Sequence, residues 1–408
     1  MRGVGAAFFV AFLIELVFSV GTADAVTFKT IYSFCAESNC ADGALPNGGL
    51  AMDADGNLYG TTQLGGSDGH GMIFELQPGQ RGKWNYKQLW SFCHQQQCKK
   101  GNSTVVPVIV DNAGNLYGAG PATTGKDDQE IFKLSADGTY ATLYQFDTNA
   151  GPDGPLTYRR AAPGAPYDGR SSLSGTLGSG VFSLTPINGG WTEATVYEFC
   201  SLPNCEDGND SVAPPLRGYH HRILGTTVTG GPNQNGGVIY EIKKDKGQWI
   251  EQVLHNFCSQ SGCTDGSQPR VSVAEDKPGN IFGTTATGGQ FGQGVIYELS
   301  NTNQFSVLYS FCSKSFCPDG AAPQATVTLG PDDNLFGTTS GGGTGYGVLY
   351  WLAPGQLIVL HTFCSESGCS DGEVPTSQLL MDHKGRLFGT TRGGGNGSGE
   401  GTVFEFKF

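Results

Sequence analysis

Twelve cysteines are the residues of this chain whose type and spacing point most directly to chemistry. They form six pairs with four residues between the members: Cys35 and Cys40, Cys93 and Cys98, Cys200 and Cys205, Cys258 and Cys263, Cys312 and Cys317, and Cys364 and Cys369. An even number of cysteines at one repeated spacing in an exported chain predicts local disulfides. A zinc site would need two pairs to converge, and free thiols are a third alternative. We predict six disulfides, each contributing about 2 kcal/mol by loop entropy, that stiffen six loops.

An aspartate follows most of these pairs in the motif Cys-x4-Cys-x-Asp-Gly, at positions 42, 207, 265, 319 and 371. Clustered carboxylates can bind a hard divalent cation or sugar hydroxyls. Asp-Gly also makes a tight turn in which the carboxylate accepts backbone N–H bonds, and we favour this turn. The segment Asp53-Ala-Asp-Gly-Asn57 resembles the start of a calcium loop but lacks the downstream glutamate ligand. We therefore predict no cofactor and no metal site, with calcium as the alternative.

Two basic residues stand out in an otherwise acidic protein. The third repeat has Tyr167-Asp168-Gly169-Arg170-Ser171 where the other repeats have Leu-Tyr-Gly-Thr-Thr, and the second has Lys99-Lys100. We expect Lys100 and Arg170 to project from the cysteine-bearing side of neighbouring repeats, in a notch for an anionic ligand such as a uronic-acid glycan. The predicted binding residues are Lys100, Arg170, Asp153 and Asp168. The alternative is that these positions have diverged from the other repeats on a solvated surface without a function.

No catalytic residue is predicted. The histidines at 70, 94, 220, 221, 255, 361 and 383 share no repeat position, and none lies in a His-x-x-x-His pattern. No nucleophile elbow is found either. We expect the histidines to be surface or filler residues.

The elements that must position these residues form seven copies of one unit. A phenylalanine ends a β-like run in every copy, with separations of 58, 54, 53, 58, 54 and 52 residues: Phe34, Phe92, Phe146, Phe199, Phe257, Phe311 and Phe363. The typical copy continues with a cysteine loop, a short apolar strand, a Leu-Tyr-Gly-Thr-Thr strand, a Gly-Gly loop and a Gly-x-Ile-Phe-Glu-Leu strand, although the third copy lacks both cysteines and the second has Ala119-Gly120 in place of Thr-Thr. Four strands per unit of ~55 residues predict an all-β, seven-bladed propeller of four-stranded antiparallel blades. We expect the Thr-Thr pairs to stabilise contacts between blades.

The phase of the repeat predicts how the ring closes. The chain begins with the last strand type, at residues 28–34, and ends with the third, at residues 401–406. We expect residues 28–34 to pair with residues 403–408 and complete the seventh blade. The predicted domain spans 26–408, with blades near 41–92, 99–146, 151–199, 206–257, 264–311, 318–363 and 370–408 plus 26–34.

The first 25 residues read as a secretory signal peptide. Arg2 precedes an apolar run from Ala6 to Val20, and Ala23-Asp24-Ala25 fits a cleavage site. We predict a secreted, periplasmic or cell-surface protein with no membrane span after cleavage. The net charge of −13 argues against nucleic acid and anionic membranes as partners. The 64 glycines among 408 residues fit many turns, and 24 Phe, 15 Tyr and 5 Trp argue against disorder.

The units Leu58-Tyr-Gly-Thr-Thr…Gly-Met-Ile-Phe-Glu-Leu76 and Leu387-Phe-Gly-Thr-Thr…Gly-Thr-Val-Phe-Glu-Phe406 resemble the GloVer (Gloeo_Verruco) tandem repeat of exported bacterial proteins. The resemblance covers almost the whole chain after the signal. It implies an extracellular or cell-surface repeat protein, and it supplies no catalytic residues. We predict a monomeric binding or scaffold module, with an extracellular glycan or another surface protein as partner. The alternatives are a carbohydrate-active hydrolase or lyase, and a purely structural surface protein.

Overall fold

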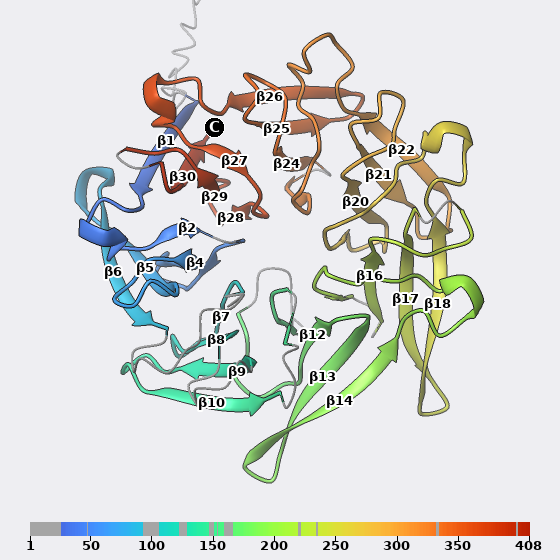
Figure 1. Ribbon diagram of the computed structural model, residues 1–408, viewed down its shortest axis with the longest axis horizontal. Coiled ribbons are helices and arrows are strands. Elements are labelled where there is room, and N and C mark those ends of the chain that lie inside the picture. The colour runs from blue at the N-terminus through green and yellow to red at the C-terminus, as the bar shows by residue number, and fades with distance from the viewer. Residues whose placement is uncertain are drawn as a thin grey trace, which may run out of the picture.

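Seven antiparallel sheets stand side by side around a central axis in the computed structural model (Figure 1). The structure describes residues 26–408 except 47, 93–105, 122–128, 147–150, 153, 159–165, 219–221, 234–235, 332–333 and 397–398. The predicted all-β, seven-bladed propeller is confirmed. The predicted signal segment lies outside the described residues, and so do both Cys93 and Cys98.

The strands follow one order from the inner to the outer edge of each blade. Blade 1 contains β2 (Ala44–Pro46), β3 (Ala51–Met52), β4 (Leu58–Leu64), β5 (Met72–Pro78) and β6 (Trp84–Ser91). Blade 2 contains β7 (Ile109–Val110), β8 (Leu116–Pro121), β9 (Gln129–Leu134) and β10 (Tyr140–Gln145). Blade 3 contains β11 (Thr157–Tyr158), β12 (Leu173–Leu177), β13 (Gly180–Ile187) and β14 (Gly190–Glu198). In blade 1 the innermost strand is split, because β2 and β3 both pair with β4.

Blades 4 to 7 repeat this arrangement. Blade 4 contains β15 (Leu216–Arg217), β16 (Ile223–Thr227), β17 (Val238–Asp245) and β18 (Gln248–Asn256), and blade 5 contains β19 (Ala274–Glu275), β20 (Ile281–Thr285), β21 (Val295–Leu299) and β22 (Phe305–Ser310). Blade 6 contains β23 (Thr328–Leu329), β24 (Leu335–Thr339), β25 (Val348–Ala353) and β26 (Gln356–Thr362). Blade 7 contains β27 (Glu373–Pro375), β28 (Leu380–Met381), β29 (Leu387–Gly393), β30 (Thr402–Lys407) and β1 (Thr27–Ser33). The second strands are buried on both faces because a blade packs on either side of them.

The ring is closed by the first strand of the chain. β1 pairs antiparallel with β30, from Thr27 opposite Lys407 to Ser33 opposite Thr402. The seventh blade therefore takes three strand types from the end of the chain and its fourth from the beginning, as predicted. This pairing removes the free edge that β30 would otherwise present.

A phenylalanine, an aromatic ring and a glycine form the contact between consecutive blades, which we call the seam. The phenylalanine ends the outer strand of one blade, and its ring lies against an aromatic residue in the third strand of the next blade. The seven pairs are Phe34–Phe74, Phe92–Phe132, Phe146–Phe182, Phe199–Tyr240, Phe257–Tyr297, Phe311–Tyr350 and Phe363–Phe404, with ring centroids 4.7–5.7 Å apart. Each third-strand ring covers the glycine opposite it in the second strand, as Tyr350 covers Gly337.

The Thr-Thr pairs stabilise the blades in two different ways. The first hydroxyl donates to a backbone carbonyl of the next blade from Thr226 to Val271 at 2.8 Å and from Thr284 to Ala325 at 3.2 Å, whereas the Thr338 hydroxyl has no partner in the described part of the chain. The second hydroxyl stays in its own blade, as Thr227 donates to the Thr229 carbonyl at 2.9 Å. The predicted role of the pairs in blade-to-blade contacts is thus confirmed for the first threonine.

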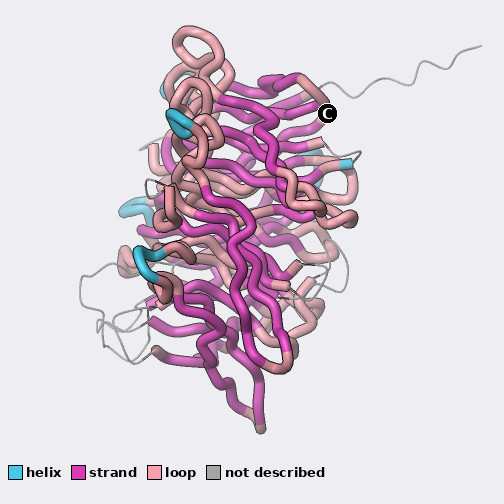
Figure 2. Tube along the Cα trace, turned by 90° about the vertical axis from the view of Figure 1, so that its right-hand side faces the viewer, coloured by secondary structure: helices cyan, strands magenta, loops and turns pink. Residues whose placement is uncertain are grey.

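The described residues contain no helix that is both long and apolar enough to cross a membrane. The helical segments in this part of the chain are short 3-10 turns, such as η1 (Ser38–Cys40) and η4 (Ser261–Cys263). In the side view of Figure 2 most of them lie along one side of the ring.

Deleting residues 26–34 removes β1 and Phe34, so blade 7 loses its outer strand and the seam to blade 1 loses one ring. We expect a sharply lower melting temperature, measured by circular dichroism on the chain that starts at residue 26. Removing Val26 alone, which precedes β1, serves as the control. An unchanged melting temperature after the larger deletion would contradict closure by β1.

Gly337→Ala should destabilise the protein, because its Cβ would lie 2.3 Å from the hydroxyl oxygen of Tyr350 and 2.5 Å from the ring. Overpacking of this kind costs about 1–3 kcal/mol. The control is Gly190→Ala, where the nearest atom is 3.8 Å away and φ lies outside the left-handed region. Urea unfolding of both variants measures the difference, and equal stabilities would show that the seam tolerates the extra methyl.

Candidate functional site

The cysteine loops and the Gly-Gly loops share one face of the ring, which we call the cysteine face. In each of five blades the carbonyl of the second cysteine accepts an N–H from the second glycine, as Cys40 does from Gly66 at 3.0 Å and Cys317 from Gly343 at 2.8 Å. Turns such as residues 53–57 connect the first and second strands at the opposite end of the blades. We call that side the turn face. This arrangement agrees with the expected alternation of strand directions.

Five of the six predicted disulfides are present: Cys35–Cys40, Cys200–Cys205, Cys258–Cys263, Cys312–Cys317 and Cys364–Cys369. Each closes a ring of six residues at the start of a loop on the cysteine face. No free cysteine occurs among the residues that the structure describes. The sixth predicted disulfide, between Cys93 and Cys98, stays a prediction, because neither Cys93 nor Cys98 belongs to the described residues. Five loops of this face are therefore cross-linked locally, as predicted.

The loop aspartates are buried and bonded to their own loops. Asp207 accepts from the backbone N–H of Ser201 at 3.0 Å, from the Ser201 hydroxyl at 2.8 Å and from the Tyr197 hydroxyl at 2.9 Å. Burial opposes ionisation of Asp207, but hydrogen bonds led by Ser201 outweigh it and hold the pKa of the carboxyl below its ordinary value. Asp42, Asp265, Asp319 and Asp371 also accept backbone N–H bonds within their loops. The turn interpretation is correct for these five aspartates.

Two histidines occupy the same repeat position, so the expectation that none did is wrong. His255 and His361 stand three residues before the first cysteine of their loops, where three other cysteine loops have tyrosine and the fourth has Trp90. The Nε2 atom of His361 lies 3.0 Å from Oδ2 of Asp371, and the His361 ring stacks on Phe28 with centroids 3.6 Å apart. Burial lowers the pKa of both histidines, and the neighbouring aspartates only partly oppose that shift. Aligning the repeats on the first cysteine of each loop would have shown that these two histidines share a position.

Glu251 takes the place of a stacking residue in blade 4. It pairs across the sheet with Ile242, as Phe305 pairs with Leu299 in blade 5, where the Phe305 ring stacks on His255. Its Oε1 atom is buried without a hydrogen-bond partner in the described part of the chain. Burial, followed by the negative charge of Asp207, raises the pKa of the Glu251 carboxyl to about 7.

The predicted basic notch required Arg170 on the cysteine face, and the structure places Arg170 elsewhere. In blade 3 the strand equivalent to Leu-Tyr-Gly-Thr-Thr is β12, whose Gly175 lies opposite Phe182, so it starts six residues after Tyr167. Asp168 and Arg170 lie instead in the turn before β12, on the turn face, where the Asp168 carboxylate accepts the N–H of Arg170 at 2.9 Å. The expectation that Arg170 projects from the cysteine face is wrong, because its segment was matched to the wrong strand. Lys100 and Asp153 lie outside the described residues.

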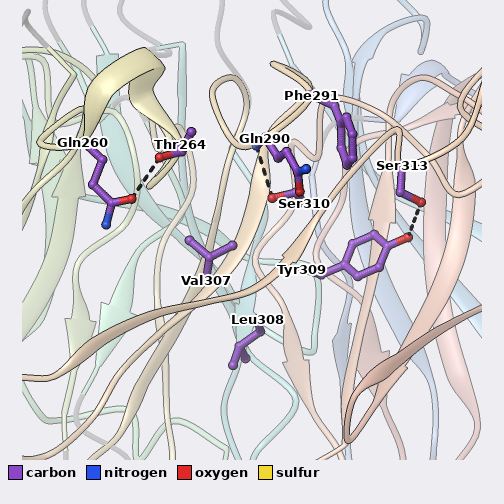
Figure 3. A pocket seen from close by; sticks show the side chains of 9 residues that line it. All are labelled: Gln260, Thr264, Gln290, Phe291, Val307, Leu308, Tyr309, Ser310 and Ser313. Carbon is purple, nitrogen blue, oxygen red and sulfur yellow. Dashed lines mark hydrogen bonds between the residues drawn. The ribbon is translucent and has the colours of Figure 1, made fainter.

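A shallow groove of about 600 Å³ lies on the cysteine face beside blade 5 (Figure 3). It is lined by two disulfide loops, the Gly-Gly loop of blade 5 and β22: Gln260, Thr264, Gln290, Phe291, Val307, Leu308, Tyr309, Ser310 and Ser313. These lining side chains are amides, hydroxyls, aliphatic groups and aromatic rings, and none carries a charge. Some are already paired, as Thr264 donates to Gln260 at 2.9 Å. Sequence reasoning missed the groove because its residues come from four separate segments.

Exposed apolar side chains also occur in several loops of the same face. Five of the exposed large hydrophobic residues belong to its loops or to the strand end that enters one: Leu64, Leu202, Phe291, Phe316 and Tyr346, with Phe316 95% exposed. Exposed apolar residues that lie beside a groove can enlarge an interaction surface. The groove and these side chains together are the candidate site.

The fold and this face define a disulfide-stiffened propeller with an uncharged surface groove. The chain belongs to the Gloeobacter/Verrucomicrobia repeat family, whose model matches residues 16–177 and 160–404. This confirms the resemblance drawn from the repeats. The search of curated proteins finds no match.

Two solved structures are similar in fold. One is the extracellular domain of BT4673 from B. thetaiotaomicron, with a TM-score of 0.56 and 13% identity over 93% of this chain and 40% of that chain. The other is a puromycin-hydrolysing peptidase from Mycobacterium tuberculosis, with a TM-score of 0.50 and 12% identity over 92% of this chain and 54% of that chain. This chain therefore spans about half the length of each or less. At these identities the likeness shows a shared propeller fold.

The double variant His255→Tyr/His361→Tyr should be less sensitive to acid than the parent protein. Because folding lowers the pKa of both histidines, their contribution to stability is present above the unfolded value of ~6.5 and is lost as pH falls through the folded value. A tyrosine can donate to the loop aspartate instead, as Tyr309 does to Asp319 at 2.7 Å. We expect the drop in melting temperature between pH 7.5 and pH 5 to shrink in the variant.

Glu251→Gln supplies a control whose effect on stability should have the opposite pH dependence. Folding raises the pKa of Glu251, so its contribution is present below the unfolded value of ~4.3 and is lost as pH rises through about 7. The glutamine should therefore raise the melting temperature at pH 8 and leave it unchanged at pH 4. An unaltered acid sensitivity of the histidine variant would exclude these two side chains as its source.

Proposed function

We propose that this protein is exported and binds an extracellular glycan through its cysteine face. Export is supported by the signal-like first 25 residues and by five disulfides, which persist in oxidising compartments. The fold neighbour from B. thetaiotaomicron is an extracellular domain, which is consistent with that location.

The observation that carries the proposal is the composition of the groove. Amides and hydroxyls that can exchange hydrogen bonds with sugar hydroxyls stand beside the Phe291 ring, and the lining has no charge. Its volume of about 600 Å³ falls within the ~300–1,000 Å³ of small-molecule sites. Disulfides in the two flanking loops hold this surface in one conformation, so little ordering is needed when a ligand binds.

A carbohydrate-active enzyme is the weaker candidate. Glu251 has the raised pKa that a general acid needs, partly because of the negative charge of Asp207, but Asp207 is bonded within its own loop, between the outer strand of blade 3 and blade 4. Asp207 is 0% exposed and its carboxylate is occupied by loop donors, so substrate has no access to it. We therefore assign binding and not hydrolysis to the candidate site.

Retention on insoluble polysaccharides tests the proposal. The chain from residue 26 is mixed with cellulose, chitin, mannan, xylan, alginate and peptidoglycan, and the bound fraction is measured after sedimentation. We expect retention on at least one polysaccharide, and its loss when Leu64, Leu202, Phe291, Phe316 and Tyr346 are all replaced by serine.

The control variant replaces exposed apolar residues away from this face, at Ile187, Ile250 and Val359, with serine. It should bind like the parent protein. No retention on any polysaccharide, or equal retention by both variants, would contradict binding through the cysteine face.

A further inference from the structure

Phe316 occupies a backbone position that disfavours a large side chain. The fifth residue of each described disulfide ring has a left-handed backbone, and in the other rings it is asparagine or glycine: Asn39, Asn204, Gly262 and Gly368, with φ between 57° and 71°. Phe316 has φ of 68° at the same position. Asparagine and glycine tolerate this conformation, whereas a bulky residue there is an outlier.

The phenylalanine gains no packing in return. Its side chain is 95% exposed, so almost none of its ring surface contacts the rest of the protein. Both the backbone strain and the exposed apolar surface cost free energy of folding, and the four other rings show that the loop closes without them. A strained and exposed residue of this kind suggests a function that lies outside the fold itself.

Phe316 lies between two other exposed rings on the cysteine face. Ser313, in the same disulfide ring, lines the groove that contains Phe291. On the other side, the carbonyl of Cys317 accepts the N–H of Gly343 at 2.8 Å, which joins the backbone next to Phe316 to the loop that carries Tyr346. Phe291, Phe316 and Tyr346 therefore follow one another along the face from blade 5 to blade 6.

A row of exposed rings beside uncharged amides and hydroxyls matches the chemistry of a neutral sugar chain. The C–H face of a pyranose ring packs against an aromatic ring, and its hydroxyls bond to amides and hydroxyls. The groove offers no cation to a carboxylate, and the net charge of −13 opposes an acidic polymer. Lys314 is the one charged residue in the Cys312–Cys317 ring, and its ammonium can donate to a neutral hydroxyl as well.

We infer that Phe316 is a stacking platform for one sugar ring of a neutral oligosaccharide, which extends the site from the groove of blade 5 toward Tyr346. This inference rests on the proposed function and adds to it the class of ligand and the residue that orients it. It replaces the uronic-acid ligand expected from Lys100 and Arg170.

Phe316→Asn tests the inference with a residue that the sibling loops already use. The probes are hexamers of β-1,4-glucose, β-1,4-mannose, β-1,4-xylose and N-acetylglucosamine, with oligogalacturonate as the acidic comparison, and affinity is measured by isothermal titration calorimetry. We expect a neutral hexamer to bind the parent protein and to lose at least about tenfold in affinity in Phe316→Asn, or about 1.4 kcal/mol. The melting temperature should stay equal or rise.

Further substitutions at Phe316 distinguish stacking of a sugar on an aromatic ring from contact with any apolar side chain. Phe316→Trp and Phe316→Tyr should keep the affinity, whereas Phe316→Leu should lose it. Asn204→Phe, which places a ring at the equivalent position outside the groove, should leave the affinity unchanged.

Three results in solution would overturn the inference, and a fourth comes from the retention assay. The first three are equal affinity in Phe316→Asn and the parent protein, a preference for oligogalacturonate, and a dimer in light scattering that dissociates in Phe316→Asn. Loss of polysaccharide retention in the five-residue serine variant but not in Phe316→Asn would overturn this inference alone and leave the proposed function standing.

Discussion

In every blade a glycine of the second strand lies beneath an aromatic ring of the third strand, and that ring touches a phenylalanine from the blade before. The glycines are Gly60, Gly118, Gly175, Gly225, Gly283, Gly337 and Gly389, each opposite its ring in the sheet. A Cβ at Gly60 would lie 2.4 Å from the Phe74 ring, so the close approach requires glycine. Because the phenylalanine comes from the outer strand of the neighbouring blade, one contact fixes both the layering within a blade and the order of blades. The closing seam, Phe34 on Phe74, follows the same rule although its strands come from opposite ends of the chain.

The seams also place the loops of the cysteine face. The phenylalanine that ends an outer strand is followed directly by the first cysteine, so each disulfide ring begins at a point fixed by packing. The aspartate of the loop then turns inward, where it satisfies the backbone of its own ring, as Asp371 does for Ser365 at 3.0 Å. The side chains at the outward positions of the ring are not needed to bond the loop backbone. They are free to differ from blade to blade without loss of the fold, and this is where Phe316 stands.

Much of the fold could be predicted because its determinants recur at one spacing. The seven phenylalanines, the cysteine pairs and the unmatched first strand predicted the propeller and its closure. Blade 3 misled the sequence reasoning, since Tyr167-Asp168-Gly169 resembles Leu-Tyr-Gly, whereas the true strand at Leu173–Leu177 has serine and leucine at two of the five positions. The register there is set by Phe182 over Gly175, a contact between strands that no local pattern reveals. The groove was equally hidden, because it forms from segments separated by up to about 50 residues.

Repetition within one chain supplies an internal comparison for judging its exceptions. A side chain that recurs in several blades is explained by the fold, as the loop aspartates and the threonines are. One that departs from the repeat at a cost needs another explanation, and Glu251 and Phe316 are two such residues in the described part of the chain. Glu251 departs at a cost, since burial keeps its carboxyl from ionising freely, but its Oε1 atom is buried and the neighbouring Asp207 is fully buried. Phe316 departs at a cost and points into solvent beside an uncharged groove. A costly exception points to function where a ligand can reach it, and of these two residues Phe316 is exposed whereas Glu251 is partly buried.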